Sequence, residues 1–389
     1  MTGLVARIEA ATPPGRDRAV DALRALAILG VVGGHWLVTA LVTDSGTVRG
    51  ASPLTAIPHL IPVSWVFQTL AVFFLVGGMV AAQSWDAARK RGVPYGQWVG
   101  GRLARLFRPV AAVLVVWALA AAVMLVAGVG EATVRALVKL VWSPLWFLLV
   151  FAVLTALTPL VARLHPLWPL VVVLHVDLVR LGLGGPRELG WVNVVAGWLV
   201  PYCLGALVAR GGLRGRTSRW ALLLGGAAGV FALVLWAGYP ASMVGVPGGR
   251  ISNLDPPSLA VVAFGLAQCG AALLLLGPLS RVLRRPAAWV VVAVVNLSAM
   301  TVFLWHQTAM IVVTMSALLF ADGPLPGLHT VPDDAGWVLA RLLWLPLFAL
   351  ALLGCWAVFR SYEQGGRRGG GSLVVRESAP ERKGWARRA

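Results

Sequence analysis

Apolar residues occur along this chain in long, nearly uninterrupted runs. A helix that crosses a bilayer needs roughly 20 mainly apolar residues, and ten runs approach or reach that length. The fifth run is the weakest, because it is short and contains ionisable residues. We therefore predict an all-α, polytopic integral membrane protein with about ten transmembrane helices. The predicted spans are residues 22–42, 63–83, 109–129, 142–162, 167–183, 190–209, 219–239, 258–280, 297–320 and 335–359.

The segments around these spans differ in character. Residues 1–21 form a short segment before the first span, and residues 22–359 form the ten-helix membrane domain. Residues 286–295 are apolar but too short to cross a bilayer, so we expect an interfacial or re-entrant lead-in to the ninth helix. Residues 360–389 are rich in glycine and charge. Such composition predicts a disordered basic tail that lies against anionic headgroups or binds a partner.

Composition excludes a soluble domain. Hydrophobic residues make up 59% of the chain and charged residues 12%, whereas soluble proteins contain about 25% charged residues. The net charge of +18 would suggest a nucleic-acid partner for a soluble protein. Sorted by predicted loop, however, 25 of the 33 basic residues lie on the side of the N-terminus and 5 on the other side. The positive-inside rule then predicts a multi-pass protein of the cell (plasma or inner) membrane with both termini in the cytoplasm and no nucleic-acid partner.

Ionisable side chains inside a membrane span are costly and indicate function. The first helix contains Arg24 and His35, eleven residues apart. At 100° per residue both project from one face, separated by a rise of about 16 Å. Arg24 would lie near the cytoplasmic surface and His35 beyond the bilayer centre. Two structural alternatives stay open: Arg24 snorkels or pairs with Asp21, and His35 is a neutral hydrogen-bonding residue between helices.

Further ionisable groups point in the same direction. His306 lies in the ninth helix at a depth similar to that of His35, so the two histidines could line one cavity; a satisfied core histidine is the alternative. Arg102 and Arg105 lie before the third span, one turn apart if that segment is helical. Guanidinium groups suit phosphates, although both arginines would also serve as positive-inside anchors.

Three other charged residues lie within predicted spans. Asp177 and Arg180 have the i, i+3 spacing of a pair that neutralises itself near the outer surface. Arg341 lies near the outer end of the last helix, where we expect its side chain to snorkel to the interface. The three cysteines lie in apolar runs, so we expect no disulfide framework, and no Cys/His spacing typical of a metal site occurs.

Five short segments, in order, resemble those of the membrane-bound acyltransferase-3 family. The first is the Asp21–Arg24 opening with a histidine that follows the arginine after ten intervening residues, and the resemblance as a whole covers 18–360. Departures occur at Ala25 (usually glycine), Gly77 (usually serine), Met79 (usually aromatic) and Phe303 (usually tyrosine). The other four segments are 72–79, 102–109, 144–148 with Trp146, and 303–306 with Trp305.

The resemblance implies a reaction and an assignment of residues. Members transfer an acyl group, often acetyl, from a cytoplasmic acyl-CoA co-substrate to a hydroxyl of a glycan, lipid or small molecule, commonly in the cell envelope, without a bound cofactor or metal. His35 would be the general base or a transient acyl carrier, with His306 assisting. The acyl donor would contact Arg24, Arg102 and Arg105, and supporting roles would fall to Asp21, Trp146 and Trp305.

Two other functions stay open on the sequence alone. A proton- or solute-coupled transporter would use His35, His306 and Asp177 as a relay. A catalytically inactive relative is suggested by Gly77, because the hydroxyl that the family places there is absent. The sequence does not identify the acceptor. The predicted outer loops are too short to contain a separate domain that would bind it.

Overall fold

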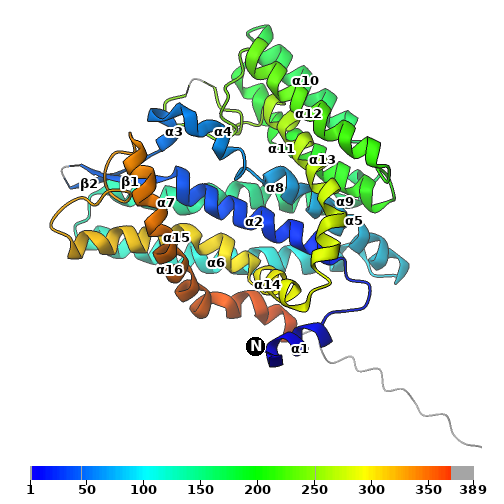
Figure 1. Cartoon of the computed structure of the whole chain (residues 1–389), viewed down its shortest axis with the longest axis horizontal. Helices are drawn as coiled ribbons and strands as arrows, with labels where there is room; N and C mark the ends of the chain where they lie inside the picture. Colours follow the sequence, from blue (N-terminus) through cyan, green and yellow to red (C-terminus); the bar gives the residue numbers. More distant parts are fainter. Residues whose placement is uncertain (1, 45, 250, 369–389) are drawn as a thin grey trace, which may run out of the picture.

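The computed structural model describes residues 2–44, 46–249 and 251–368. These residues form a bundle of helices with one small two-stranded sheet (Figure 1). Within this described part, nine helical stretches are long and apolar enough to cross a membrane. The prediction of an all-α, polytopic membrane protein is therefore confirmed.

The long spans correspond to nine of the ten predicted runs. Some are single α-helices, and others join consecutive helical segments. They are α2 (Arg18–Val38), α5 (Leu70–Lys90), α6 (Tyr95–Val126), α7 with η2 and α8 (Glu131–Trp142, Ser143–Leu145 and Trp146–Ala156), η4 with α11 (Arg187–Leu189 and Gly190–Ala209), α12 (Arg216–Trp236), α13 (Leu259–Val282), α15 (Ala299–Phe320) and α16 (Ala335–Arg368).

The fifth predicted run forms a shorter helix that still traverses the bundle. It comprises α10 (Leu167–Asp177) and the π-helical segment η3 (Leu178–Gly182). Asn296, just before α15, donates a hydrogen bond to the Asp21 carbonyl at the start of α2. Glu363, near the end of α16, accepts hydrogen bonds from the first turn of α15. The start of α2 and the end of α16 therefore lie at the same end of the bundle. The chain between them must cross the bundle an even number of times, so the nine long spans need one more crossing, which α10 supplies.

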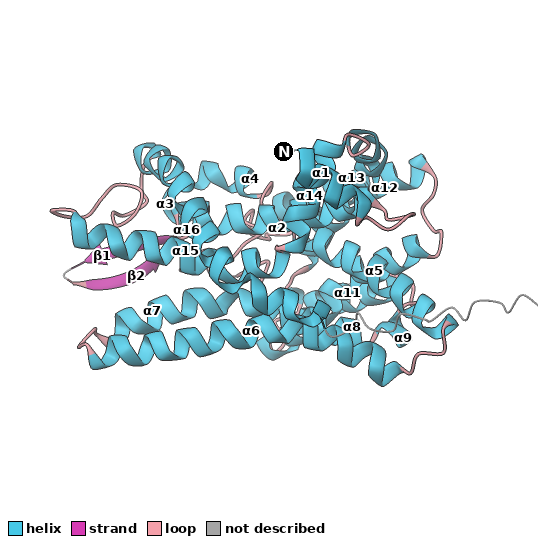
Figure 2. Cartoon of the chain, turned by 90° about the horizontal axis from the view of Figure 1, so that it is seen from below, coloured by secondary structure: helices cyan, strands magenta, loops and turns pink. Residues whose placement is uncertain are grey.

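We call the end that holds the start of α2 the basic end. There α1 (Thr2–Ala10) packs against α14 (Pro286–Leu297), the predicted lead-in to the ninth helix, and Trp289 Nε1 donates to Thr12 Oγ1. At the opposite end, Val48 of a β-hairpin donates its N–H to Thr133 Oγ1 on α7, and Figure 2 shows the hairpin beside that helix. The remaining elements are β1 (Ala40–Asp44), β2 (Thr47–Ala51), α3 (Pro53–Ala56), η1 (Pro58–Leu60), α4 (Ile61–Ser64) and α9 (Thr158–Val161).

The largest differences from the predicted boundaries concern three helices. α7 begins at Glu131 rather than at 142, because its charged residues recur every four residues on one face and interrupt the apolar run. α6 begins at Tyr95, so Arg102 and Arg105 lie on a helix and not in a loop; Pro109 lies inside this helix and does not start it. α16 continues to Arg368, so 360–368 of the predicted disordered tail are helical, and 369–389 lie outside the described residues.

The centre of the bundle depends on close packing between α5 and α11. A Cβ atom at Gly78 would overlap the Tyr202 carbonyl, and one at Gly205 would overlap the Leu75 carbonyl. Small residues allow helices in membranes to approach until their backbones touch. Beside this contact, Phe74 of α5 stacks on Trp198 of α11 with ring centroids 5.1 Å apart. Substituting either glycine would therefore separate two central helices.

Candidate active site

The structure places His35 beside His306 in the middle of the bundle. Their ring centroids are 5.1 Å apart, with the rings tilted by 44°. His35 is half-buried on α2, and His306 is buried on α15. A hydrogen bond of 2.9 Å from Trp36 Nε1 to the His306 carbonyl joins the two helices next to the pair. Two residues 271 positions apart in the sequence thus form one histidine pair.

The surroundings of His306 determine which of its nitrogens can accept a proton. Nδ1 contacts the carbonyl of Phe303 on the same helix. A carbonyl only accepts hydrogen bonds, so the hydrogen of a neutral ring must be on Nδ1 and the lone pair on Nε2. Among the described residues, Nε2 has no hydrogen-bond partner although it is buried. A buried acceptor without a partner is costly, and it is available to a substrate or to His35.

The end of α2 that carries His35 is held by Arg341 of α16. This guanidinium donates hydrogen bonds of 2.6 Å each to the carbonyls of Trp36 and Thr39, and one of 2.9 Å to that of Gly327. It lies over the Phe348 ring and is 1% exposed. The prediction that Arg341 snorkels to the interface was therefore wrong. A helix C-terminus presents carbonyls without donors, and a buried cation satisfies them here.

A second polar feature lies at the basic end, where a cleft of about 280 Å³ contains all three arginines that were expected to contact the acyl donor. Five helices form its walls, and Arg24, Arg102 and Arg105 line it together. The cleft is therefore cationic and suits a phosphate group. The other lining residues are Val80, Leu103, Leu106, Phe151, Thr155 and Met300.

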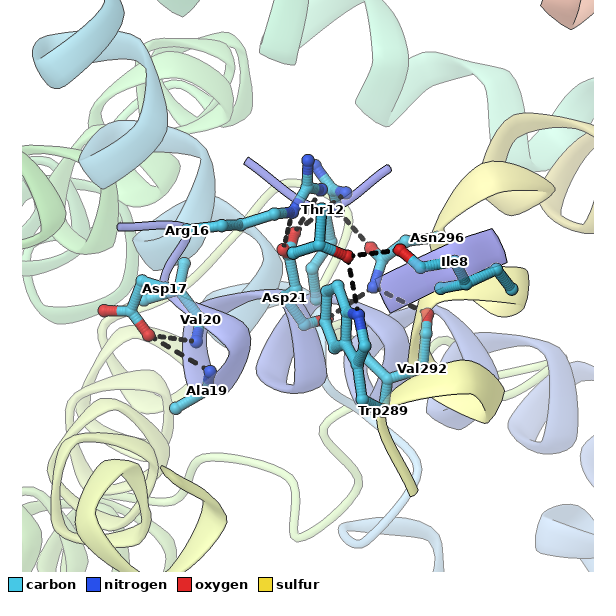
Figure 3. A network of polar contacts seen from close by, with 11 residues as sticks. Ile8, Thr12, Arg16, Asp17, Ala19, Val20, Asp21, Trp289, Val292 and Asn296 are labelled. Carbon is cyan, nitrogen blue, oxygen red and sulfur yellow. Dashed lines mark hydrogen bonds and ion pairs between the residues drawn. The ribbon is translucent and has the colours of Figure 1, made fainter. Parts of the chain in front are cut away.

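Arg24 is held in the cleft by polar contacts with neighbouring segments. Its Nε donates to Asn296 Oδ1, and its NH2 group lies 3.2 Å from Asp21. Asp21 also pairs with Arg16, and Figure 3 shows this carboxylate within a network that includes Asn296 and Trp289. The pairing of Arg24 with Asp21, open on the sequence, is present. It coexists with a place in the cleft wall, since the Arg24 side chain remains 30% exposed.

Arg102 lines the cleft from α6. It lies over the Trp98 ring at 5.3 Å, and its NH2 group donates a long hydrogen bond of 3.5 Å to the Val80 carbonyl. Within the described part of the chain, its buried Nε has no partner. Arg105 lies one turn further along α6 and is exposed. The cleft therefore combines one buried donor without a partner with two further guanidinium groups.

An aromatic cluster that the sequence did not indicate connects the cleft with the histidine pair. Phe151 lines the cleft and contacts Phe73, which contacts Phe147. The Phe147 and Phe303 ring centroids are 4.6 Å apart, and Phe303 contacts His306 at 5.7 Å. Residues from three helices thus form one continuous apolar contact path. Phe73, Phe147 and Phe303 each lie in a segment that resembles the family, but no single segment reveals that they meet.

The two tryptophans expected to support the site lie around it. Trp305 stacks on Phe359 of α16 with ring centroids 3.7 Å apart, so it joins two helices. Trp146 contacts Phe147 at 6.5 Å and thereby borders the aromatic cluster. Both contacts fit a packing role.

Gly77, where the family usually has serine, packs against the same cluster. A Cβ atom at this position would overlap the Phe151 ring. That ring is itself held by Phe73, Phe74 and Tyr202. Phe151 therefore occupies the space that a serine side chain at position 77 would need.

Asp177 lies at the opposite end, away from the histidines. Its carboxylate accepts hydrogen bonds from Asn193, Tyr239 and the Leu259 N–H, at 3.0, 3.0 and 2.7 Å. The predicted partner Arg180 is 3.8 Å away. Burial, followed by the charge of Asp177, raises the pKa of Tyr239, so the phenol keeps its proton and remains a donor. The described structure therefore separates Asp177 from the histidine relay considered for a transporter.

Comparison with known protein families gives a match, which covers both the histidine pair and the cleft. A family model described as an acyltransferase domain matches residues 17–360, which include the histidine pair and every residue that lines the cleft. No curated protein and no solved structure matches the chain.

Proposed function

The chain belongs to the membrane-bound acyltransferase-3 family, and from this membership we propose that it transfers an acyl group, commonly acetyl, from acyl-CoA to a hydroxyl group. Membership makes it a membrane acyltransferase. The acceptor class that we propose is a glycan, lipid or small molecule of the cell envelope. The observation that carries the proposal is the aromatic path between a cationic cleft and a histidine pair.

The cleft would hold the phosphates of the donor. Charge-assisted hydrogen bonds from guanidinium forks are the strongest protein contacts to phosphate. The acyl-bearing arm would then extend along the aromatic cluster toward the histidines. Met300 in the cleft and His306 lie six residues apart on α15, a rise of about 9 Å, which a flexible arm can span. We also propose that the basic end faces the cytoplasm of a cell (plasma or inner) membrane, where acyl-CoA is available and where the positive-inside rule places it.

We assign His35 as the general base. Being half-buried, it is accessible to an acceptor hydroxyl, whose proton it takes as the oxygen attacks the thioester carbon. The resulting imidazolium has a second N–H, and the Nε2 lone pair of His306 can accept a hydrogen bond from it. When the tetrahedral intermediate breaks down, the C–S bond is cleaved and His35 returns the proton to the CoA thiolate. The acyl ester and free CoA are the products.

Acyl turnover in membranes with labelled acetyl-CoA tests the assignment. We expect His35→Ala to abolish transfer while the protein is still inserted and folded. If His35→Ala had no effect and no donor were consumed, the inactive-relative hypothesis would be favoured. Solute uptake by proteoliposomes without any acyl donor would instead favour the transporter.

The donor cleft has its own test. Arg102→Gln should raise KM for acyl-CoA by roughly tenfold or more, because a charge-assisted hydrogen bond contributes about 1.5–3 kcal/mol. Arg108→Gln is the matched control, since it removes an exposed charge from the same helix and does not line the cleft. Equal effects of the two substitutions would indicate a general charge effect and contradict the assignment.

The acceptor is best identified in cells. Mass spectrometry of envelope glycans, lipids and metabolites from a deletion strain should reveal one acylated species that is lost. Restoring the gene should restore that species, whereas a copy encoding His35→Ala should not.

A further inference from the structure

A second groove lies at the basic end, between the start of α12 and the end of α13. It has a volume of about 570 Å³ and shares no lining residue with the arginine cleft. Arg18 at the start of α2 donates to the carbonyl of Leu283, which directly follows α13. This bond shows that the end of α13, and with it the groove, lies at the basic end. Four arginines line it together with an aromatic residue and aliphatic residues: Arg214, Arg216, Arg219, Arg281, Trp220, Leu223, Ala271, Leu274, Leu275, Gly277 and Pro278.

The charge of this groove is not balanced by ion pairs within the described part of the chain. No ion pair in the described structure involves any of its four arginines. The sequence contains no Asp or Glu in 189–254 or in 256–321, the segments that contain both helices. Arg219 donates to the carbonyls of Leu213 and Leu273 at 3.0 Å each, which fixes one guanidinium in the wall. Four cations around one concave surface create a positive potential that attracts an anion.

The rest of the groove is apolar and faces the perimeter of the bundle. Among the residues of α12, only Gly226 and Val230 are buried, so this helix is the least enclosed of the long spans besides α16. Trp220 and Leu275 are 42% and 47% exposed. A tryptophan beside arginines at a helix end is typical of the membrane–water interface. A ligand that places an anion among the arginines would thus have its apolar part beside lipid-facing leucines.

We propose that this groove binds the phosphate headgroup of an anionic glycerophospholipid from the leaflet at the basic end. The phosphodiester would be held by Arg216 and Arg281, one from each helix, with Arg214 and Arg219 beside them. The acyl chains would lie along Leu223, Leu274 and Leu275. The site would hold α12 against α13 by neutralising the charge that both helices present.

Native mass spectrometry of the full-length protein tests the proposal without any enzymatic reaction. The protein is purified from micelles that contain equal amounts of phosphatidylglycerol and phosphatidylcholine. We expect one phosphatidylglycerol to be retained preferentially. Arg216→Gln/Arg281→Gln should weaken this retention by about thirtyfold, because each of the two arginines would contribute about 1 kcal/mol of attraction to the bound anionic lipid.

Two matched variants keep the test decisive. Arg210→Gln/Arg284→Gln removes the same charge from exposed positions at the same end that do not line the groove, and it should leave retention unchanged. Gly277→Glu places a carboxylate in the groove, where a side chain meets open space, and it should reduce retention even if the double variant misfolds. Equal retention of both lipids, equal loss in the control, or displacement by soluble glycerol phosphate at concentrations equal to the lipid's would overturn the proposal.

Discussion

Two buried polar groups at different depths of this bundle differ in how many of their hydrogen-bonding atoms have a partner. At the opposite end, both carboxylate oxygens of Asp177 are occupied, by two side chains and a backbone N–H. In the centre, His306 uses Nδ1 on its own helix, and its Nε2 has no partner among the described residues. Both clusters place polar atoms where water is scarce. The Asp177 carboxylate is fully paired among the described residues, although Oδ1 of its donor Asn193 has no partner, whereas the His306 ring is paired at one nitrogen only.

This difference distinguishes a buried group that stabilises the fold from one that is available to a ligand. A fully satisfied buried carboxylate connects segments, here α10, α11, α13 and the loop that holds Tyr239, and its removal should unfold rather than inactivate. A buried acceptor without a partner lowers stability unless a ligand uses it. We therefore expect substitutions in the two clusters to affect different measurements.

The largest effect is expected at the incomplete cluster. In His306→Asn the side-chain amide can still donate to the Phe303 carbonyl, whereas the Nε2 acceptor is lost. We expect kcat for acyl transfer to fall by about 10²–10⁴-fold, the range of general acid–base contributions, with little change in melting temperature. Turnover assays combined with thermal unfolding in detergent measure both. A large loss of stability with retained kcat would reverse the comparison.

The complete cluster should respond in the other way. Asp177→Ala leaves Arg180 and three further donors without their acceptor, and removing one member of a buried ion pair costs roughly 3–5 kcal/mol. We expect a lower melting temperature and reduced yield, with kcat per folded molecule unchanged. Asp322→Ala, at an exposed position of the same end, is the control. Loss of turnover in a fully folded Asp177→Ala protein would argue for a relay function.

Arg341 tests whether a fully hydrogen-bonded structural residue also positions the histidine pair. Arg341→Met removes the donor to three carbonyls around the end of α2, and we expect a destabilisation of about 1.5–3 kcal/mol. Because that turn carries His35, kcat should fall by more than KM for acyl-CoA changes. Arg341→Lys should restore part of kcat. Equal changes in kcat and KM, unrelated to the charge at this position, would indicate a purely structural role.

The smallest effect is expected at Gly77. Gly77→Ser forces the Phe151 ring to move, and overpacking of this kind costs about 1 kcal/mol or somewhat more. Phe151→Leu in the same chain should remove the overlap and restore the melting temperature. If Gly77→Ser alone increased turnover without a change in stability, the absent hydroxyl would have to be assigned a catalytic function. Double-mutant analysis of the two substitutions gives the coupling.

The sequence predicted the local geometry of the site better than its long-range contacts. The spacing of Arg24 and His35 on one helix follows from helical periodicity, and the depth of His306 follows from counting along its span. Hydropathy also found the short fifth helix. These are properties of single helices, for which the bilayer constrains length and direction.

Contacts between distant helices were beyond such reasoning. Arg341 was placed at the interface because the sequence does not reveal that the carbonyls of Trp36 and Thr39 lie beside it. The aromatic cluster combines residues of α5, α8 and α15, and the sequence segments that contain them do not show that they contact one another. The start of α7 was missed because its amphipathic face interrupts the apolar run with charge. In each case the decisive partner lies on another helix.

Glu363 has a practical consequence for anyone who shortens or labels this protein. Its carboxylate accepts hydrogen bonds from the Met300 and Thr301 N–H groups and from Thr301 Oγ1. These donors begin the helix that presents His306. A truncation at residue 359, the boundary that hydropathy suggests, would remove this cap and leave α15 with a frayed first turn. Topology reporters and affinity tags should therefore be attached beyond Arg368, and an inactive shortened protein would not indicate that the tail itself is functional.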